Sequence, residues 1–251
     1  LAALSRAQDA IARELPPPAL PALTELRTRA ANAMPLLPRE ELAADPASRA
    51  AITRLATLLD DVAMPDLARG ALGRVKAADE ATQRAMLGAV LADAIPVESI
   101  AEHIFAAAAV QVIAAHRTAR LDPLLPQPVA DGVCPCCGGP PVASAVVADV
   151  NVEGVRYVQC SLCAAQWNHV RVKCVSCGST KGIAYQAIEG IADTIKAETC
   201  DECRTYVKIL NRRKDPELEP VADDVASLGL DLLVTEAGWK RAGVNPYLLG
   251  Y

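Results

Sequence analysis

Four cysteine-bearing stretches decide the fold of this chain: residues 134–138 (CPCCG), 157–167 (YVQCSLCAAQW), 169–179 (HVRVKCVSCGS) and 195–210 (IKAETCDECRTYVKIL). They hold all nine cysteines of the 251-residue chain, and none precedes Cys134. Eight of the nine form C-x-x-C pairs, which in a reduced compartment usually bind metal and in a secreted protein can form disulfides. The pairs are Cys134/Cys137, Cys160/Cys163, Cys174/Cys177 and Cys200/Cys203.

The spacing of these pairs repeats. In each half, 22 residues separate the first pair from the second, and ten residues separate the halves. A glycine follows the first pair of each half, Gly138 and Gly178, where the tight turn around a metal often needs a positive φ. We interpret the region as a tandem repeat of one metal-binding module. Sequential pairing, with one ion in each half, is favoured over a cross-braced arrangement that would join alternate pairs.

Two such pairs can place four sulfurs in a tetrahedron around one ion, and this donor set suits zinc or a single iron. With all four positions occupied by sulfur, no place remains for a substrate, so we expect a structural metal and no catalytic residue. The predicted ligands are Cys134, Cys137, Cys160 and Cys163 for one ion, and Cys174, Cys177, Cys200 and Cys203 for the other.

The remaining polar candidates are few. Cys136 has Ser176 as its counterpart in the second half, so we interpret it as a spare thiol beside the site. His103 and His116 are expected to be ordinary surface or core residues. Trp167, His169 and Arg171 lie between the two modules and are candidates for partner binding, although a half-exposed loop explains them as well.

Residues 1–122 are typical of a helical bundle, because prolines divide them into segments with helical apolar spacing. Ile52, Leu55, Leu59 and Val62 are an example of that spacing. The apolar run 104–115 is about 12 residues long, too short for a bilayer, and predicts a buried central helix. Short β-like segments then flank the cysteine pairs: 142–147, 155–159, 170–173, 183–188 and 206–210.

The sequence therefore predicts an α+β protein in which an N-terminal helical bundle is followed by two tandem rubredoxin-like or zinc-ribbon-like metal modules and a C-terminal helix. That helix is expected over 221–236, with Val221, Val225, Leu228 and Leu232 on one face, before an extended tail (NPYLL, 245–249). The expected segments are 1–122 (helical domain), 123–132 (linker), 133–168 (first metal module), 169–214 (second metal module) and 215–251 (C-terminal helix and tail).

Composition and charge exclude several classes of protein. The chain is 52% apolar, which is incompatible with a disordered chain, and its net charge of −5 argues against a nucleic-acid binder. Residues 129–214 have a net charge of only +2, which gives a zinc-ribbon nucleic-acid binder little support. The first residues (LAALSRAQDAIARELPPP) show no secretory signal, so we expect a cytoplasmic protein without membrane insertion.

The four quoted stretches, together with VADDVASLGLDLL (221–233) and the ending NPYLL, resemble the FdhE family of formate dehydrogenase accessory proteins. The resemblance covers the chain from about Cys134 to Leu249. It implies a cytoplasmic factor that helps to mature a respiratory formate dehydrogenase and binds its catalytic subunit before export. It also implies rubredoxin-type iron at the eight paired cysteines in preference to zinc. A one-electron redox protein is the alternative, and a homodimer is left open.

Overall fold

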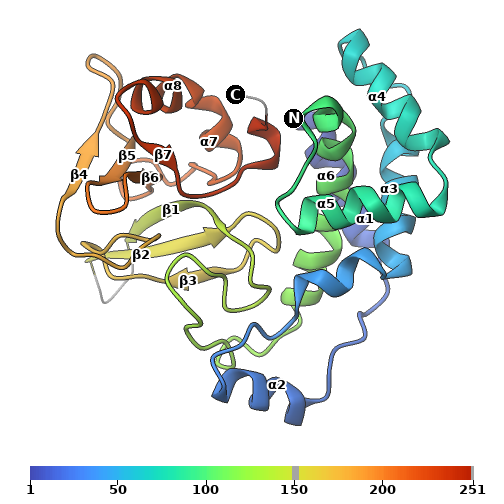
Figure 1. Ribbon diagram of the computed structural model, residues 1–251, viewed down its shortest axis with the longest axis horizontal. Coiled ribbons are helices and arrows are strands. Elements are labelled where there is room, and N and C mark those ends of the chain that lie inside the picture. Colours follow the sequence, from blue (N-terminus) through green and yellow to red (C-terminus); the bar gives the residue numbers. More distant parts are fainter. Residues whose placement is uncertain (149–152, 250–251) are drawn as a thin grey trace. The chain divides into compact units, whose positions relative to one another are not determined.

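The computed structural model describes residues 1–148 and 153–249, which form two compact units. The helical unit comprises Leu1–Gln127, Cys136–Gly139 and the residues from Pro246 on, and the sheet unit comprises Pro128–Pro135 and Pro140–Asn245. The predicted α+β fold, with a helical region followed by a cysteine-rich sheet, is confirmed (Figure 1).

After α1, the α-helices of the helical unit begin near prolines or capping aspartates. Asp45 accepts a hydrogen bond from the N–H of Ala47 at 2.9 Å, and Asp79 accepts one from Thr82 at 2.8 Å, so each caps its helix. The helices are α1 (Ala2–Glu14), α2 (Leu23–Ala31), α3 (Pro46–Leu58), α4 (Asp66–Ala77), α5 (Glu80–Leu91) and α6 (Ile100–Thr118), with the 3-10 turns η1 (Arg39–Ala43) and η2 (Val97–Ser99).

Helix α6 is the core of this unit, because α1, α3, α4 and α5 all pack against it. The stretch Val97–Thr118 is long and apolar enough to cross a membrane, but 61% of its most apolar window is buried inside the protein. The prediction of a buried central helix therefore explains why this stretch is so apolar. Of the apolar stripe predicted on α3, Ile52, Leu55 and Leu59 are buried.

The C-terminal tail is also part of the helical unit. Residues 245–249 were expected to be extended, but Pro246–Leu248 form the 3-10 turn η3. The hydroxyl of Tyr247 donates to Oε1 of Gln111 on α6 at 2.7 Å, and Nε2 of Gln8 on α1 donates to the Tyr247 hydroxyl oxygen at 3.2 Å. These hydrogen bonds hold the tail as a turn against two helices.

One sheet contains the strands of both predicted metal modules. Its strand order is β3-β2-β1-β6-β5-β4, and β7 pairs with β6. Neighbours within each module are antiparallel, whereas β1 and β6 are parallel and join the two modules. The strands are β1 (Pro141–Ala148), β2 (Glu153–Cys160), β3 (Gln166–Asn168), β4 (Ile183–Gln186), β5 (Ile195–Cys200), β6 (Thr205–Asn211) and β7 (Lys240–Arg241).

The strands differ from the prediction in two ways: one predicted strand is absent, and three observed strands were not predicted. Residues 170–173 form no strand, because the carbonyl oxygens of Arg171 and Lys173 accept side-chain hydrogen bonds from Arg156 instead of pairing with a neighbouring strand. Strands β3, β5 and β7 were not predicted. Strand β5 (IKAETC) has few large apolar residues, and its charged Glu198 is buried by a tertiary contact that no local pattern reveals.

The predicted C-terminal helix is two helices, α7 (Ala222–Ala226) and α8 (Leu228–Glu236), with the break at Ser227. The Ser227 hydroxyl and carbonyl accept hydrogen bonds from Nζ of Lys208 on β6 at 2.9 and 3.0 Å, which fixes the break. The buried face also differs from the prediction: Leu230 and Val234 pack on the sheet, whereas Leu232 is 55% exposed.

A set of four charged side chains, three of them buried and Arg241 half-buried, fastens α7 and α8 to the sheet. Nζ of Lys208 contacts the carboxylates of Asp224 and Asp231, and the guanidinium of Arg241 donates to the same two carboxylates at 2.5 Å. The two positive and two negative charges balance. Substituting any one of the four by an uncharged residue would destabilise the fold, because a charge would then remain buried without its partner.

Candidate metal centres

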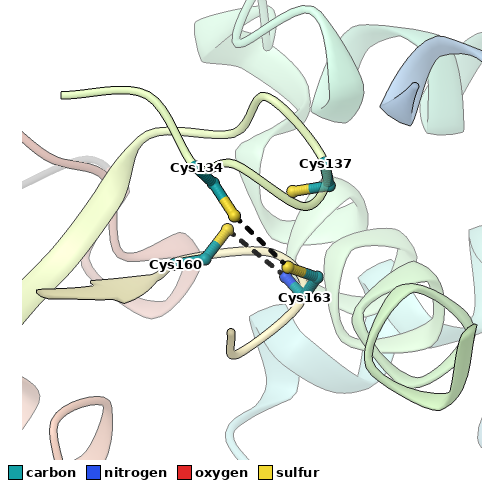
Figure 2. A group of neighbouring side chains, drawn as sticks. All are labelled: Cys134, Cys137, Cys160 and Cys163. Atoms are coloured by element: carbon teal, nitrogen blue, oxygen red, sulfur yellow. Dashed lines mark hydrogen bonds between the residues drawn. The ribbon is translucent and has the colours of Figure 1, made fainter. Parts of the chain in front are cut away.

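The structure brings the eight paired cysteines together in two groups of four. Cys134, Cys137, Cys160 and Cys163 form the first group, which we call centre 1 (Figure 2). Cys174, Cys177, Cys200 and Cys203 form the second group, centre 2. This is the sequential pairing and not the cross-braced one, since each group combines the two neighbouring C-x-x-C pairs of one half.

The sulfur positions fit one tetrahedral ion in each group. All four sulfurs of a group lie within 4.8 Å of one another. The Sγ–Sγ distance is 3.6 Å for Cys134–Cys163, 3.7 Å for Cys174–Cys203 and 3.8 Å for Cys177–Cys200. Four sulfurs about 2.3 Å from a central zinc ion would lie about 3.8 Å apart, whereas a disulfide requires about 2.0 Å. The donor set therefore suits zinc or a single iron.

Backbone N–H groups point at the sulfurs within the tight turns of the C-x-x-C pairs. In centre 1, the N–H groups of Leu162 and Cys163 lie 3.4 and 3.5 Å from Sγ of Cys160, and that of Gly139 lies 3.4 Å from Sγ of Cys137. Figure 2 shows the Cys163 contact as a dashed line. Such donors offset the negative charge of a thiolate.

The residue after each C-x-x-C pair has a positive φ in all four turns. Gly138 and Gly178, singled out in the sequence, have φ of 78° and 73°. Ala164 and Arg204 occupy the same position after the other two pairs, with φ of 57° and 56°. A non-glycine residue rarely adopts this conformation, so the four turns share one backbone geometry that their sequences only half reveal.

Centre 2 is more open than centre 1. All four cysteines of centre 1 are buried, whereas in centre 2 Cys177 is exposed and Cys203 is half-buried. The thiol pKa values in centre 2 diverge accordingly. Burial raises the pKa of Cys174 to about 12. For Cys203, burial is outweighed by hydrogen bonds from the hydroxyl and N–H of Thr205, which lower its pKa to about 7.

A buried ion pair connects the strands that lead into the two centres. Arg156 lies on β2, which ends at Cys160, and Glu198 lies on β5, which ends at Cys200. Their side chains are 2.9 Å apart and both are buried. Burial raises the pKa of Glu198, and Arg156 opposes that shift. The same guanidinium donates to the carbonyl oxygens of Arg171 at 3.5 Å and Lys173 at 3.3 Å, and so anchors the segment that enters Cys174.

Cys136 lies outside both groups of four and is buried. Its carbonyl oxygen accepts a hydrogen bond from the N–H of Leu37 at 2.7 Å, which ties the first C-x-x-C turn to the segment before η1. The structure therefore assigns Cys136 a role in holding this turn through its backbone carbonyl.

The three predicted partner-binding residues lie on β3 and just after it. Trp167 packs on the buried cluster of Val158, Val175 and Val207. His169 is half-buried, and its Nε2 lies 3.1 Å from the Lys173 carbonyl oxygen. Burial lowers the pKa of His169, with a smaller effect from the charge of Arg156. Arg171 is exposed, between Val170 and Val172, which are 63% and 57% exposed.

Fold and site together define a two-unit protein with a helical body and a duplicated four-cysteine centre. Three family models match in succession: "FdhE, N-terminal" over residues 1–131, "FdhE, central domain" over 133–171 and "FdhE, C-terminal domain" over 172–248. The chain therefore belongs to the FdhE family.

Individual relatives agree with this assignment. The chain is 46% identical to the FdhE homolog of Rhizobium meliloti (strain 1021) over 253 residues, which cover 100% of this chain and 83% of that protein. It is 47% identical to the FdhE homolog of Cronobacter sakazakii over 115 residues, 46% of this chain and 37% of that protein. The crystal structure of the FdhE protein from Pseudomonas aeruginosa matches with a TM-score of 0.83 and 30% identity, covering 98% of this chain and 87% of that one.

The Arg156 anchor predicts a selective effect on centre 2. Arg156→Lys keeps a positive charge beside Glu198 but loses the planar fork that donates to two backbone carbonyls. We expect about 10- to 100-fold weaker binding of one of two ions, in line with other residues that support metal ligands, while the other ion is held as before. Competition with a chromophoric chelator measures this. Arg212→Lys is the matched control, because Arg212 also donates to a backbone carbonyl, that of Pro216. Unchanged affinity for both ions would contradict the anchoring role.

Proposed function

We propose that the protein is a non-catalytic accessory factor that acts in the cytoplasm on respiratory formate dehydrogenase and binds its catalytic subunit before export. The observation that carries the proposal is family membership along the whole chain together with two four-cysteine centres. A centre whose four positions are all filled by protein sulfurs supports the fold and, while all four bonds are kept, has no open position for a substrate.

The histidines support a role without catalysis. Each imidazole contacts a backbone carbonyl oxygen: Nδ1 of His103 lies 2.7 Å from that of Ser99, Nε2 of His116 lies 2.9 Å from that of Pro16, and His169 contacts Lys173. Among the residues that the structure describes, the groupings of His, Cys, Asp and Glu able to hold a metal ion are the two centres alone. Neither of them includes a histidine or a carboxylate to act as a general acid or base.

We place the contact with the catalytic subunit at Trp167, His169 and Arg171. The exposed Val170 and Val172 on either side of Arg171 give this segment the apolar area, and Arg171 the charge, that protein interfaces commonly use. The segment also leads into Cys174, so partner contact and centre 2 would be adjacent along the chain.

A nucleic-acid partner is disfavoured by how the cations of the sheet unit are paired. The side chain of Lys173 lies 2.7 Å from Asp131, and that of Arg204 lies 3.1 Å from Asp201. Asp193 contacts both Lys196 and Lys214, at 3.2 and 2.6 Å. These four cations, each paired with a carboxylate, supply little of the unopposed positive charge that phosphate binding requires.

Affinity capture tests the proposal. We expect the tagged protein, expressed in cells that make formate dehydrogenase, to copurify the catalytic subunit, and deletion of its gene to reduce formate oxidation. The double variant Arg171→Glu/Val172→Asp should lose copurification and keep its ions, whereas Lys181→Glu, a charge reversal at another exposed position, should behave as wild type. Absence of the subunit from the capture, with formate oxidation intact in the deletion strain, would refute the proposal.

A second candidate function is one-electron transfer by rubredoxin-like iron. It is favoured by the N–H groups directed at the sulfurs and by the exposure of Cys177, since both hydrogen bonding and solvent access tune an iron–thiolate centre. Protein purified without air should then be coloured and should bleach reversibly on reduction. Colourless protein that contains only zinc, obtained from iron-replete cells, would refute this function.

A further inference from the structure

The two centres share one spacing and one turn geometry but differ in what covers them. Cys137 and Cys177 are equivalent positions of the repeat, the second cysteine of the first pair in each half. Cys137 is 3% exposed, whereas Cys177 is exposed to solvent. Because the ligand chemistry is identical, the difference between these two cysteines isolates the effect of access.

Cys137 lies in a turn that belongs to the helical unit. Leu37, Leu42 and Ala114, which are residues of the same unit, line the small space beside it. A Cβ added to the next residue, Gly138, would lie 3.1 Å from Cγ of Pro35, so the turn is in close contact with its neighbours. Cys137 is therefore far less accessible to an incoming molecule than Cys177 is.

The corresponding turn of centre 2 lies beside a surface side chain instead. A Cβ added to Gly178 would meet Oδ2 of Asp131, an exposed residue whose carboxylate pairs with Lys173 at 2.7 Å. The other three cysteines of centre 2 are less exposed than Cys177: Cys174 and Cys200 are buried and Cys203 is half-buried. One ligand of four is thus presented to solvent while the others are held by the sheet and its connections.

From this asymmetry we propose that centre 2 is a ligand-exchange site, in which the sulfur of an external thiol replaces Cys177 on the bound ion. The incoming thiol gives up its proton and forms a sulfur–metal bond; the bond to Cys177 breaks, and Cys177 takes up a proton. Four sulfur ligands are kept throughout and no electron is transferred. Cys174, Cys200 and Cys203 keep their bonds during the exchange, and the ion, held by three protein sulfurs instead of four, passes more readily to a competing chelator. Centre 1 does not exchange.

A thiol is the class of ligand that the site favours. The site already selects ions that prefer soft sulfur donors, and a thiolate replaces a thiolate without changing the charge at the ion. The proposal goes beyond the accessory function and does not depend on it, since it requires only that both centres bind an ion. It gives centre 2 a means of forming a mixed complex with a cysteine-bearing molecule.

The test uses the full chain loaded with two zinc ions. A chromophoric chelator reports zinc release while glutathione, the probe thiol, is increased in concentration. We expect one of the two equivalents to be lost in a fast phase whose rate rises with glutathione, and the other to be retained or lost slowly at a rate independent of it. Iodoacetamide labelling followed by peptide mass spectrometry, which needs no variant, should modify Cys177 before Cys137.

The variants Cys177→Ser and Cys137→Ser form a matched pair. Cys177→Ser opens the position that the external thiol takes, so it should raise the rate of the glutathione-dependent phase, whereas Cys137→Ser should leave the rate of that phase unchanged. Release of both ions in a single phase, a fast phase that does not respond to glutathione, or labelling of Cys137 as early as Cys177 would each overturn the proposal. The labelling result stands even if either variant fails to fold.

Discussion

Four sulfurs held within 4.8 Å of one another are the constraint on which the sheet unit depends. As thiolates without an ion, the four sulfurs would repel one another strongly. As thiols, they would make no metal bonds to hold the tight turns in place. A cation at the centre of each group resolves both problems. Zinc binding to comparable small peptides contributes about 10–16 kcal/mol at pH 7, as large as the whole stability of an ordinary domain. The apolar clusters of this unit are small, so the ions contribute where the core does not.

Around this constraint, buried charges join parts that the repeat alone would leave independent. The parallel pairing of β1 with β6 makes one sheet of two modules. The Arg156–Glu198 pair crosses from the strand that ends at Cys160 to the strand that ends at Cys200. On α7 and α8, Asp224 and Asp231 bind Lys208 and Arg241. Each pair contributes little net stability by comparison with an apolar core. Each nevertheless fixes how its elements are aligned, and removal of one partner would be strongly destabilising.

The sequence was most informative where chemistry requires particular residues at particular spacings. The C-x-x-C pairs, the equal loops and the glycines after Cys137 and Cys177 predicted two groups of four cysteines, and the periodic apolar residues predicted the helical body. Tertiary contacts decided the rest. No strand forms at 170–173, because carbonyl groups of this segment accept hydrogen bonds from the Arg156 side chain. The last helix is interrupted at Ser227, which is hydrogen-bonded to Lys208. Ala164 and Arg204 adopt the backbone geometry of glycine without being glycine, which no local pattern reveals. The unequal exposure of Cys137 and Cys177 likewise depends on residues far away in the chain.

The central claim is that two ions, one in each group of four cysteines, hold the cysteine-rich half of the protein in its fold. Native mass spectrometry of the intact chain, compared with the mass of the denatured chain without reductant, tests it most directly. The account predicts that the native mass exceeds the denatured mass by two metal ions, minus the mass of the protons that the ligands lose on binding. It also predicts that the denatured mass corresponds to a chain with nine free thiols. A folded chain that carries no ion, or a denatured mass lowered by disulfide formation among the eight paired cysteines, would contradict it.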